Sequence, residues 1–111
     1  MNRIPMSPSA VALFRALIGR ADGPRDRILL IEAGSVEWHS LTFAGERHSL
    51  QLRITGSDSD AMLERICGGL GDAEFSIPGR TVADIAVVGA PSREPDGSFI
   101  LTIEALTLAE D

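Results

Sequence analysis

The chain has 111 residues, which is enough for one folded domain and too few for two independent cores. Hydrophobic residues make up 44% of it and charged residues 23%, a balance typical of a soluble globular protein rather than a disordered or membrane-embedded one. The net charge of -6 repels phosphate backbones and argues against nucleic-acid binding. We therefore expect residues 1–111 to form a single domain.

The inventory of reactive side chains is narrow. All 10 basic residues are arginines, and there is no lysine or tyrosine, which excludes Schiff-base chemistry, lysine-dependent phosphate loops and phenolic acids. Arginine in place of lysine is also typical of a GC-rich bacterial genome. The single cysteine, Cys67, cannot form an internal disulfide, and no export signal is recognised, so we expect a cytoplasmic protein.

The first predicted element is a helix that starts at Ser7 and Pro8. Serine is a good N-cap, and proline costs nothing at the first helical position because its missing N–H has no partner there. Apolar residues then recur at helical spacing from Ala10 to Ile18, and Gly19 and the polar residues after it end the helix. This apolar run is too short to cross a membrane, so we expect no membrane partner.

Three strands are expected after this helix. Residues 27–32 form an apolar strand, which a turn at 33–35 would end. Residues 36–43 and 48–55 would then form a hairpin around residues 44–47.

The register of this hairpin follows from separating apolar from polar residues, because a slip of one residue moves every side chain to the other face. The expected inward pairs are Phe43 with His48, Leu41 with Leu50, and His39 with Leu52. The opposite face then carries Trp38 directly across from Arg53.

The second half of the chain predicts a helix from residues 56–60 onward, with a buried stripe at Leu63, Ile66, Cys67 and Leu70, which the glycines of 68–71 end. A short extended piece at 74–77 and strands at 81–89 and 98–108 follow. The resulting fold class is α+β in the order α-β-β-β-α-β-β. It has two layers: one mostly antiparallel sheet of about five strands, with both helices packed on one face.

The other face of that sheet is the candidate site. Tryptophan and arginine are the residue types most enriched in the centres of protein interfaces, and a guanidinium over an indole adds about 0.5–1 kcal/mol. The candidate binding residues are Trp38, Arg53, Gln51 and Glu104. The alternative interpretation is that the indole only shields its own sheet.

No other group of residues predicts a specific chemistry. His39 and His48 would lie roughly 13 Å apart along the strands, too far to share a zinc ion, so no metal, cofactor or catalytic residue is expected. Cys67 faces the core, and the glycines after its helix suit a C-cap rather than a phosphate loop.

Two interpretations of function remain open. The first is a non-catalytic module that pairs with a second copy or another protein through the open sheet face. The second is a binding protein or modest enzyme for a small anionic molecule, with Arg53 holding the ligand and His39 or Glu37 as the acid or base. The sequence has no set of reactive residues at a spacing typical of a catalytic site, and this favours the first interpretation.

Overall fold

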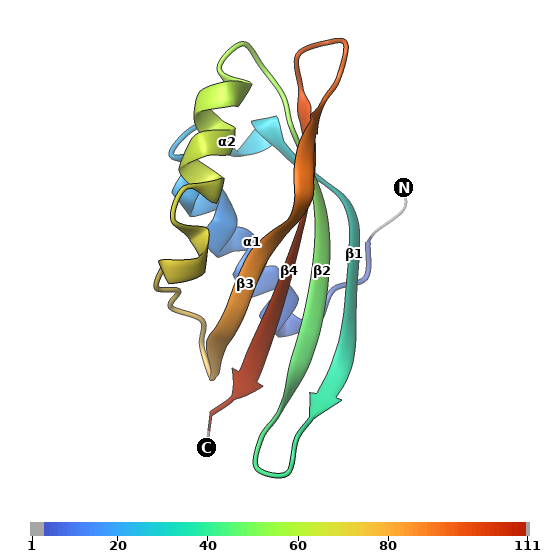
Figure 1. Cartoon of the computed structure of the whole chain (residues 1–111), viewed down its shortest axis with the longest axis vertical. Coiled ribbons are helices and arrows are strands. Elements are labelled where there is room, and N and C mark those ends of the chain that lie inside the picture. Colours follow the sequence, from blue (N-terminus) through green and yellow to red (C-terminus); the bar gives the residue numbers. More distant parts are fainter. Residues whose placement is uncertain (1–3, 111) are drawn as a thin grey trace.

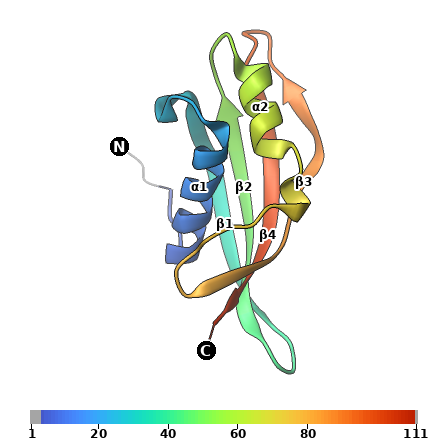
Figure 2. The same ribbon diagram turned by 90° about the vertical axis from the view of Figure 1, so that its left-hand side faces the viewer.

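The computed structural model describes residues 4–110. Its helices are α1 (Pro8–Ala21) and α2 (Ser59–Cys67), with short 3-10 turns at Arg25–Arg27 and Leu70–Asp72. Its strands are β1 (Ile28–His39), β2 (Ala44–Ile54), β3 (Arg80–Arg93) and β4 (Phe99–Ala109), which form one antiparallel sheet in the order β1-β2-β4-β3. Both helices cover the same face of the sheet (Figures 1 and 2). The prediction of an α+β fold with two helices and an antiparallel sheet is confirmed.

Helix α1 begins as the sequence predicts. The Ser7 hydroxyl accepts the N–H of Ala10 at 3.2 Å, and Pro8 occupies the first helical position. Leu13 and Leu17 are fully buried. The helix ends at Ala21 with Asp22 in the left-handed region as its C-cap, within the stretch from Gly19 onward where its end is predicted. Across residues 4–110, neither helix has the length and apolar character needed to cross a membrane.

The sheet has four strands rather than the expected five, because the predicted turn at residues 33–35 does not exist. Strand β1 runs through Gly34 without interruption. A β-bulge at Ile31 shifts the register by one residue, so the side chains on either side of it alternate between the two faces in opposite phase. Before the bulge Ile28 is buried, and after it Ala33 packs against the same core. The extended piece at 74–77 contributes only an isolated bridge between Ile77 and Arg80.

The predicted register of the β1–β2 hairpin is wrong. The chain turns at residues 40–43 instead of 44–47, and the Ser40 N–H donates to the Phe43 carbonyl at 2.8 Å. The Ser40 hydroxyl also accepts the Phe43 N–H at 3.0 Å, so this serine stabilises the turn. As a result Leu41 and Phe43 are exposed at the tip instead of facing inward. Figure 2 shows this hairpin extending beyond the ends of both helices.

The core lies between the helices and alternate residues of the two central strands. Strands β2 and β4 have neighbours on both sides, so their inward side chains are the most completely covered. The fully buried apolar side chains of this layer are Leu13, Leu17, Leu50, Leu52, Ile54, Met62, Ile66 and Ile103. The inward direction predicted for Leu50 and Leu52 is therefore confirmed.

Two arginines join the carboxyl ends of the helices to each other. Arg20 of α1 donates through Nε to the carbonyl of Ile66 at 3.0 Å and through Nη2 to that of Gly68 at 2.6 Å. Arg65 of α2 donates through Nε to the carbonyl of Ala21 at 2.6 Å. The last carbonyls of a helix have no partner within it and carry partial negative charge, so each guanidinium stabilises the other helix.

Replacing either arginine should weaken the helix layer. We expect Arg20→Ala and Arg65→Ala each to lower the free energy of unfolding by about 1.5–3 kcal/mol, which is the usual contribution of a hydrogen bond to a charged group. Chemical denaturation of the purified variants measures this. Arg15→Ala, at an exposed position of α1, is the matched control and should change stability by less than about 0.5 kcal/mol. Equal losses at all three positions would contradict the prediction.

Candidate functional site

The sheet face that lacks helices, called the open face below, is defined by strand alternation. Odd-numbered residues of β2 and even-numbered residues of β4 point to it, because their neighbours in sequence point to the core. Its central part consists of Val36, Trp38, Gly45, Arg47, Ser49, Gln51, Arg53, Ile100, Thr102, Glu104, Leu106 and Leu108. All four predicted binding residues lie on this face.

Several apolar side chains of the open face are exposed. Near the β1–β2 turn, Val36 of β1 is 64% exposed; its cross-strand neighbour is Arg47, which separates it from the partly exposed Leu106 of β4. Further from this turn, Leu29 of β1 and Val88 of β3 are 48% and 47% exposed on opposite edges of the sheet. The open face therefore keeps large apolar side chains in solvent on both of its edge strands.

Trp38 does not contact Arg53. It lies across from Gly45, whereas Arg53 lies across from Leu29, so the two residues are about 26 Å apart along the strands. The predicted cation–π pair is therefore absent. The described residues instead place Arg93 over Phe99 at 5.4 Å and Arg20 over Phe75 at 6.0 Å.

Gly45 explains part of the role of Trp38. A Cβ at Gly45 would collide with the backbone carbonyl of Thr107 on β4, so no larger residue fits there without a shift. Gly45 is buried even though it points to the open face, and Trp38 is its cross-strand neighbour. An aromatic ring beside a strand glycine covers the backbone that the glycine exposes. Trp38 thus shields its own sheet and still presents part of its indole to the outside.

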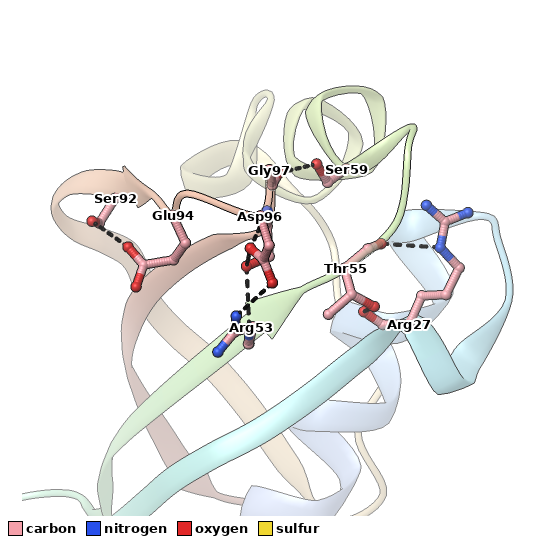
Figure 3. Close-up of polar contacts among 9 residues, drawn as sticks. Arg27, Arg53, Thr55, Ser59, Ser92, Glu94, Asp96 and Gly97 are labelled. Atoms are coloured by element: carbon pink, nitrogen blue, oxygen red, sulfur yellow. Dashed lines mark hydrogen bonds and ion pairs between the residues drawn. The ribbon is translucent and has the colours of Figure 1, made fainter.

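Arg53 is held by the β3–β4 loop. It donates through Nε to the Ser98 hydroxyl at 3.1 Å and through Nη2 to Asp96 Oδ2 at 2.8 Å, as Figure 3 shows for Asp96. The Ser98 hydroxyl, its backbone N–H and the Arg53 guanidinium together lower the pKa of Asp96 to about 2. Two of the five N–H donors of Arg53 therefore fix the loop.

The alternative site around Arg53 and His39 is not assembled. His39 lies across from Ala44 at the turn end of β1, with Nε2 at 3.8 Å from the Glu37 carboxylate, and Arg53 is about 30 Å away along the strands. Asp84 of β3 and Glu104 of β4 both point to the open face. They lie diagonally to each other, because Asp84 is opposite Leu106 and Glu104 is opposite Ala86.

Sequence reasoning missed a buried polar network centred on His48. Its Nδ1 lies 2.7 Å from the Ser35 hydroxyl of β1, and its Nε2 lies 2.8 Å from the Thr107 hydroxyl of β4. His48 is only 1% exposed, and this burial lowers the pKa of its imidazole, against the opposing effect of Glu46. The predicted inward direction of His48, next to Leu50 and Leu52 on the same face of β2, is confirmed. Its predicted partner is wrong, because His48 lies opposite Ser35 rather than Phe43.

Glu46 extends this network to the first turn of α1. The Ser9 hydroxyl donates to its carboxylate, and Arg80 of β3 lies 3.7 Å from it. The Ser9 hydrogen bond is the largest cause of the lowered pKa of Glu46. The network therefore ties all four strands to α1.

A serine beside a histidine is also the arrangement of a nucleophile and its base. Here the second imidazole nitrogen faces the Thr107 hydroxyl rather than a carboxylate, and Ser9 and Arg80 engage Glu46. A neutral imidazole offers one donor and one acceptor, which the two hydroxyls match. The geometry thus fits a structural cross-link between strands.

The remaining candidates have local roles. Cys67 is half-buried against the core, and burial raises the pKa of its thiol. The Gly68 N–H donates to the Glu64 carbonyl at 2.8 Å, which confirms the predicted C-cap. Within residues 4–110, no three His, Cys, Asp or Glu side chains gather in a group that could hold a metal ion.

Comparisons of the chain with protein-family models, with curated proteins and with solved structures give no match in any of the three.

The buried imidazole predicts acid sensitivity. Because the folded state lowers the pKa of His48 below its ordinary 6.5, the unfolded chain binds this proton more readily. The free energy of unfolding should therefore fall as the pH drops below about 6.5, by at most about 1.4 kcal/mol per pH unit. Urea denaturation between pH 7.5 and 5 checks this.

His48→Gln keeps hydrogen-bonding capacity but removes the titration. This variant should be less stable at pH 7.5 and should lose less stability between pH 7.5 and 5. An identical pH slope in the variant and the native chain would show that His48 does not cause the effect.

Proposed function

We propose that this protein is a non-catalytic interaction module that forms a homodimer by packing its open face against that of a second copy. The observation that carries the proposal is the set of exposed apolar side chains on a sheet face that no helix covers. An antiparallel sheet tolerates one solvated face, but such a face is then usually polar. Val36, Leu29 and Val88, which are 64%, 48% and 47% exposed, depart from that pattern.

The size of the open face suits a dimer. Four strands of about 11 residues give a face about 19 Å wide and about 36 Å long, or roughly 700 Å². A stable specific interface buries about 800 Å² on each partner. Covering the open face with a second copy would therefore bury the expected area without any contribution from the helices.

The charges of the open face favour a second copy over an unrelated partner. The face carries Arg47 together with the acidic Glu104, Asp84 and Glu32, so both signs are present. An isologous interface requires one surface to complement itself, and a face of mixed charge can do so. A chain of net charge -6 would otherwise repel its own copy.

The small-molecule interpretation has less support. The hollow in the middle of the open face, between Gly34 and Thr102, measures about 170 Å³. Ligand sites for small organic molecules usually occupy about 300–1,000 Å³. A hollow of that size, about 480 Å³ at Leu63, Cys67 and Phe99, is lined by neither Arg53 nor His39. Arg53, which was expected to hold an anion, already forms an ion pair with Asp96, whose carboxylate neutralises its charge.

The proposal includes the cellular location of the protein. The lone half-buried thiol of Cys67 and the arginine-only complement support a cytoplasmic protein of a bacterial cell.

Substitutions on the open face should weaken self-association. Trp38→Ala removes a half-buried aromatic side chain, and Val36→Glu replaces an exposed apolar side chain of the face with a carboxylate. Each should raise the dimer dissociation constant at least about thirtyfold, since about 2 kcal/mol is lost at such positions. Sedimentation velocity over a range of concentrations measures the constant, and circular dichroism checks that the variants are folded.

Val11→Glu is the matched control, because Val11 is a partly exposed valine on α1 in the helix layer. It should leave the dissociation constant within about threefold of the native value. A native chain that stays monomeric at millimolar concentration would overturn the proposal, as would a dimer that Val11→Glu disrupts and Val36→Glu does not.

A further inference from the structure

We infer that a hollow between the first turns of α1 and the turn that leads into β3 binds a small carboxylate with an apolar body. This Arg15–Arg80 hollow measures about 330 Å³, within the range of about 300–1,000 Å³ that small-molecule sites usually occupy. It lies on the helix side of the sheet and shares no residue with the open face or with the expected site at Arg53 and His39. A ligand in this hollow is therefore a property beyond the proposed dimer and does not depend on it.

One wall of the Arg15–Arg80 hollow is a face of α1. Pro8, Val11, Ala12 and Arg15 line it, and their spacing of three, four and seven residues puts them on the same side of the helix. Arg15 is exposed and has no ion pair within residues 4–110. This wall thus offers a ligand three apolar side chains and, one turn further along the helix, a guanidinium group.

The opposite wall is held by a tight turn. The Arg80 N–H donates to the Ile77 carbonyl at 3.2 Å, and Gly79 between them has a φ of 70°, in the left-handed region that glycine adopts readily. Ile77 is only 6% exposed and anchors the turn in the core. Pro78 and Arg80 line the hollow from this turn, which Figure 2 shows beside the first turn of α1. Both walls are therefore in place before a ligand binds.

The charges around the hollow suit one carboxylate. The described residues that line it include two arginines and no aspartate or glutamate. The Arg80 Nη2 lies 3.7 Å from Glu46 Oε1, too far for a hydrogen bond, and the Glu46 carboxylate already accepts the Ser9 hydroxyl. The guanidinium groups of Arg15 and Arg80, taken with Glu46, leave one positive charge unpaired. A bound carboxylate would neutralise it through charge-assisted hydrogen bonds.

The apolar walls favour a carboxylate with an apolar body over an inorganic anion, because they gain from burial only against an apolar surface. Two larger hollows suit such a ligand less well. The hollow at Leu63 is also lined by Asp60 and Glu64, whose carboxylates repel an anion. A hollow of about 600 Å³ at the carboxyl end of α1 is lined by Asp22 as well as by two arginines, and the last helix carbonyls there carry partial negative charge.

Isothermal titration calorimetry with octanoate, kept below its micelle-forming concentration, tests the site in the full-length protein. We expect saturable binding with a dissociation constant below about 1 mM, a modest affinity for a ligand of about ten non-hydrogen atoms. 1-Octanol has the same apolar chain without the charge and should bind at least about tenfold more weakly. Octylamine, which the arginines repel, and acetate, which lacks the apolar body, should show no binding at the same concentrations.

Three substitutions in the hollow should weaken octanoate binding. Arg15→Gln and Arg80→Gln each remove a guanidinium group and should raise the dissociation constant at least about fivefold. Val11→Trp keeps both charges but fills the hollow, and it should raise the constant at least about tenfold. Because Arg80 also lies beside Glu46, circular dichroism and thermal unfolding without ligand check that each variant is folded.

Arg25→Gln and Leu63→Trp are the matched controls. Arg25 is an exposed arginine outside this hollow, and Leu63 lines the hollow at Cys67. Neither substitution should change the dissociation constant more than about twofold. The inference is overturned if octanoate does not bind saturably, if 1-octanol or octylamine binds as tightly, or if the controls weaken binding more than Arg15→Gln and Val11→Trp do. The proposed dimer is measured separately by sedimentation, so its failure and the failure of this site are distinguishable.

Discussion

The two-residue alternation of the central strands, with helices on one side only, is the constraint on which the rest of this structure depends. Side chains of β2 and β4 alternate between a face covered by α1 and α2 and a face that no part of the described chain covers. The same few residues therefore have to build a core and a surface at once. Leu50 and Leu52 point to the helices and are fully buried, whereas Gln51, between them, points to the open face.

The covered face holds a polar network as well as an apolar core. His48 cross-links β1, β2 and β4 through two hydroxyls, and Glu46 connects the same region to Ser9 of α1. Buried polar groups of this kind stabilise a fold only when every member has a partner, and they penalise alternative registers in which the partners are lost. The network thus reinforces the strand pairing that places the residues of the open face.

The arginines divide into structural and free ones. Arg20 and Arg65 cap the two helices, and Arg27 donates to the Thr55 carbonyl next to the turn into α2 (Figure 3). Arg53 holds the β3–β4 loop through Asp96. These contacts use the planar, multiply donating guanidinium, which lysine could not replace. Arg47 differs from these residues, because it is exposed on the open face and has no ion pair within residues 4–110.

The sequence by itself determined the local elements of this protein: the Ser7 and Pro8 start of α1, the glycine end of α2, the inward direction of Leu50 and Leu52, and the helix-free face that carries Trp38, Gln51, Arg53 and Glu104. These follow from capping chemistry and periodicity, which act over a few neighbouring residues. Only the tertiary structure decided that β1 continues through Gly34, that the hairpin turns at residues 40–43, and that Trp38 and Arg53 lie at opposite ends of the sheet. The reason is that a register is a choice between alignments with similar local patterns. Contacts from distant parts of the chain, such as those of Thr107 with His48 and of Asp96 with Arg53, favour one alignment over the others.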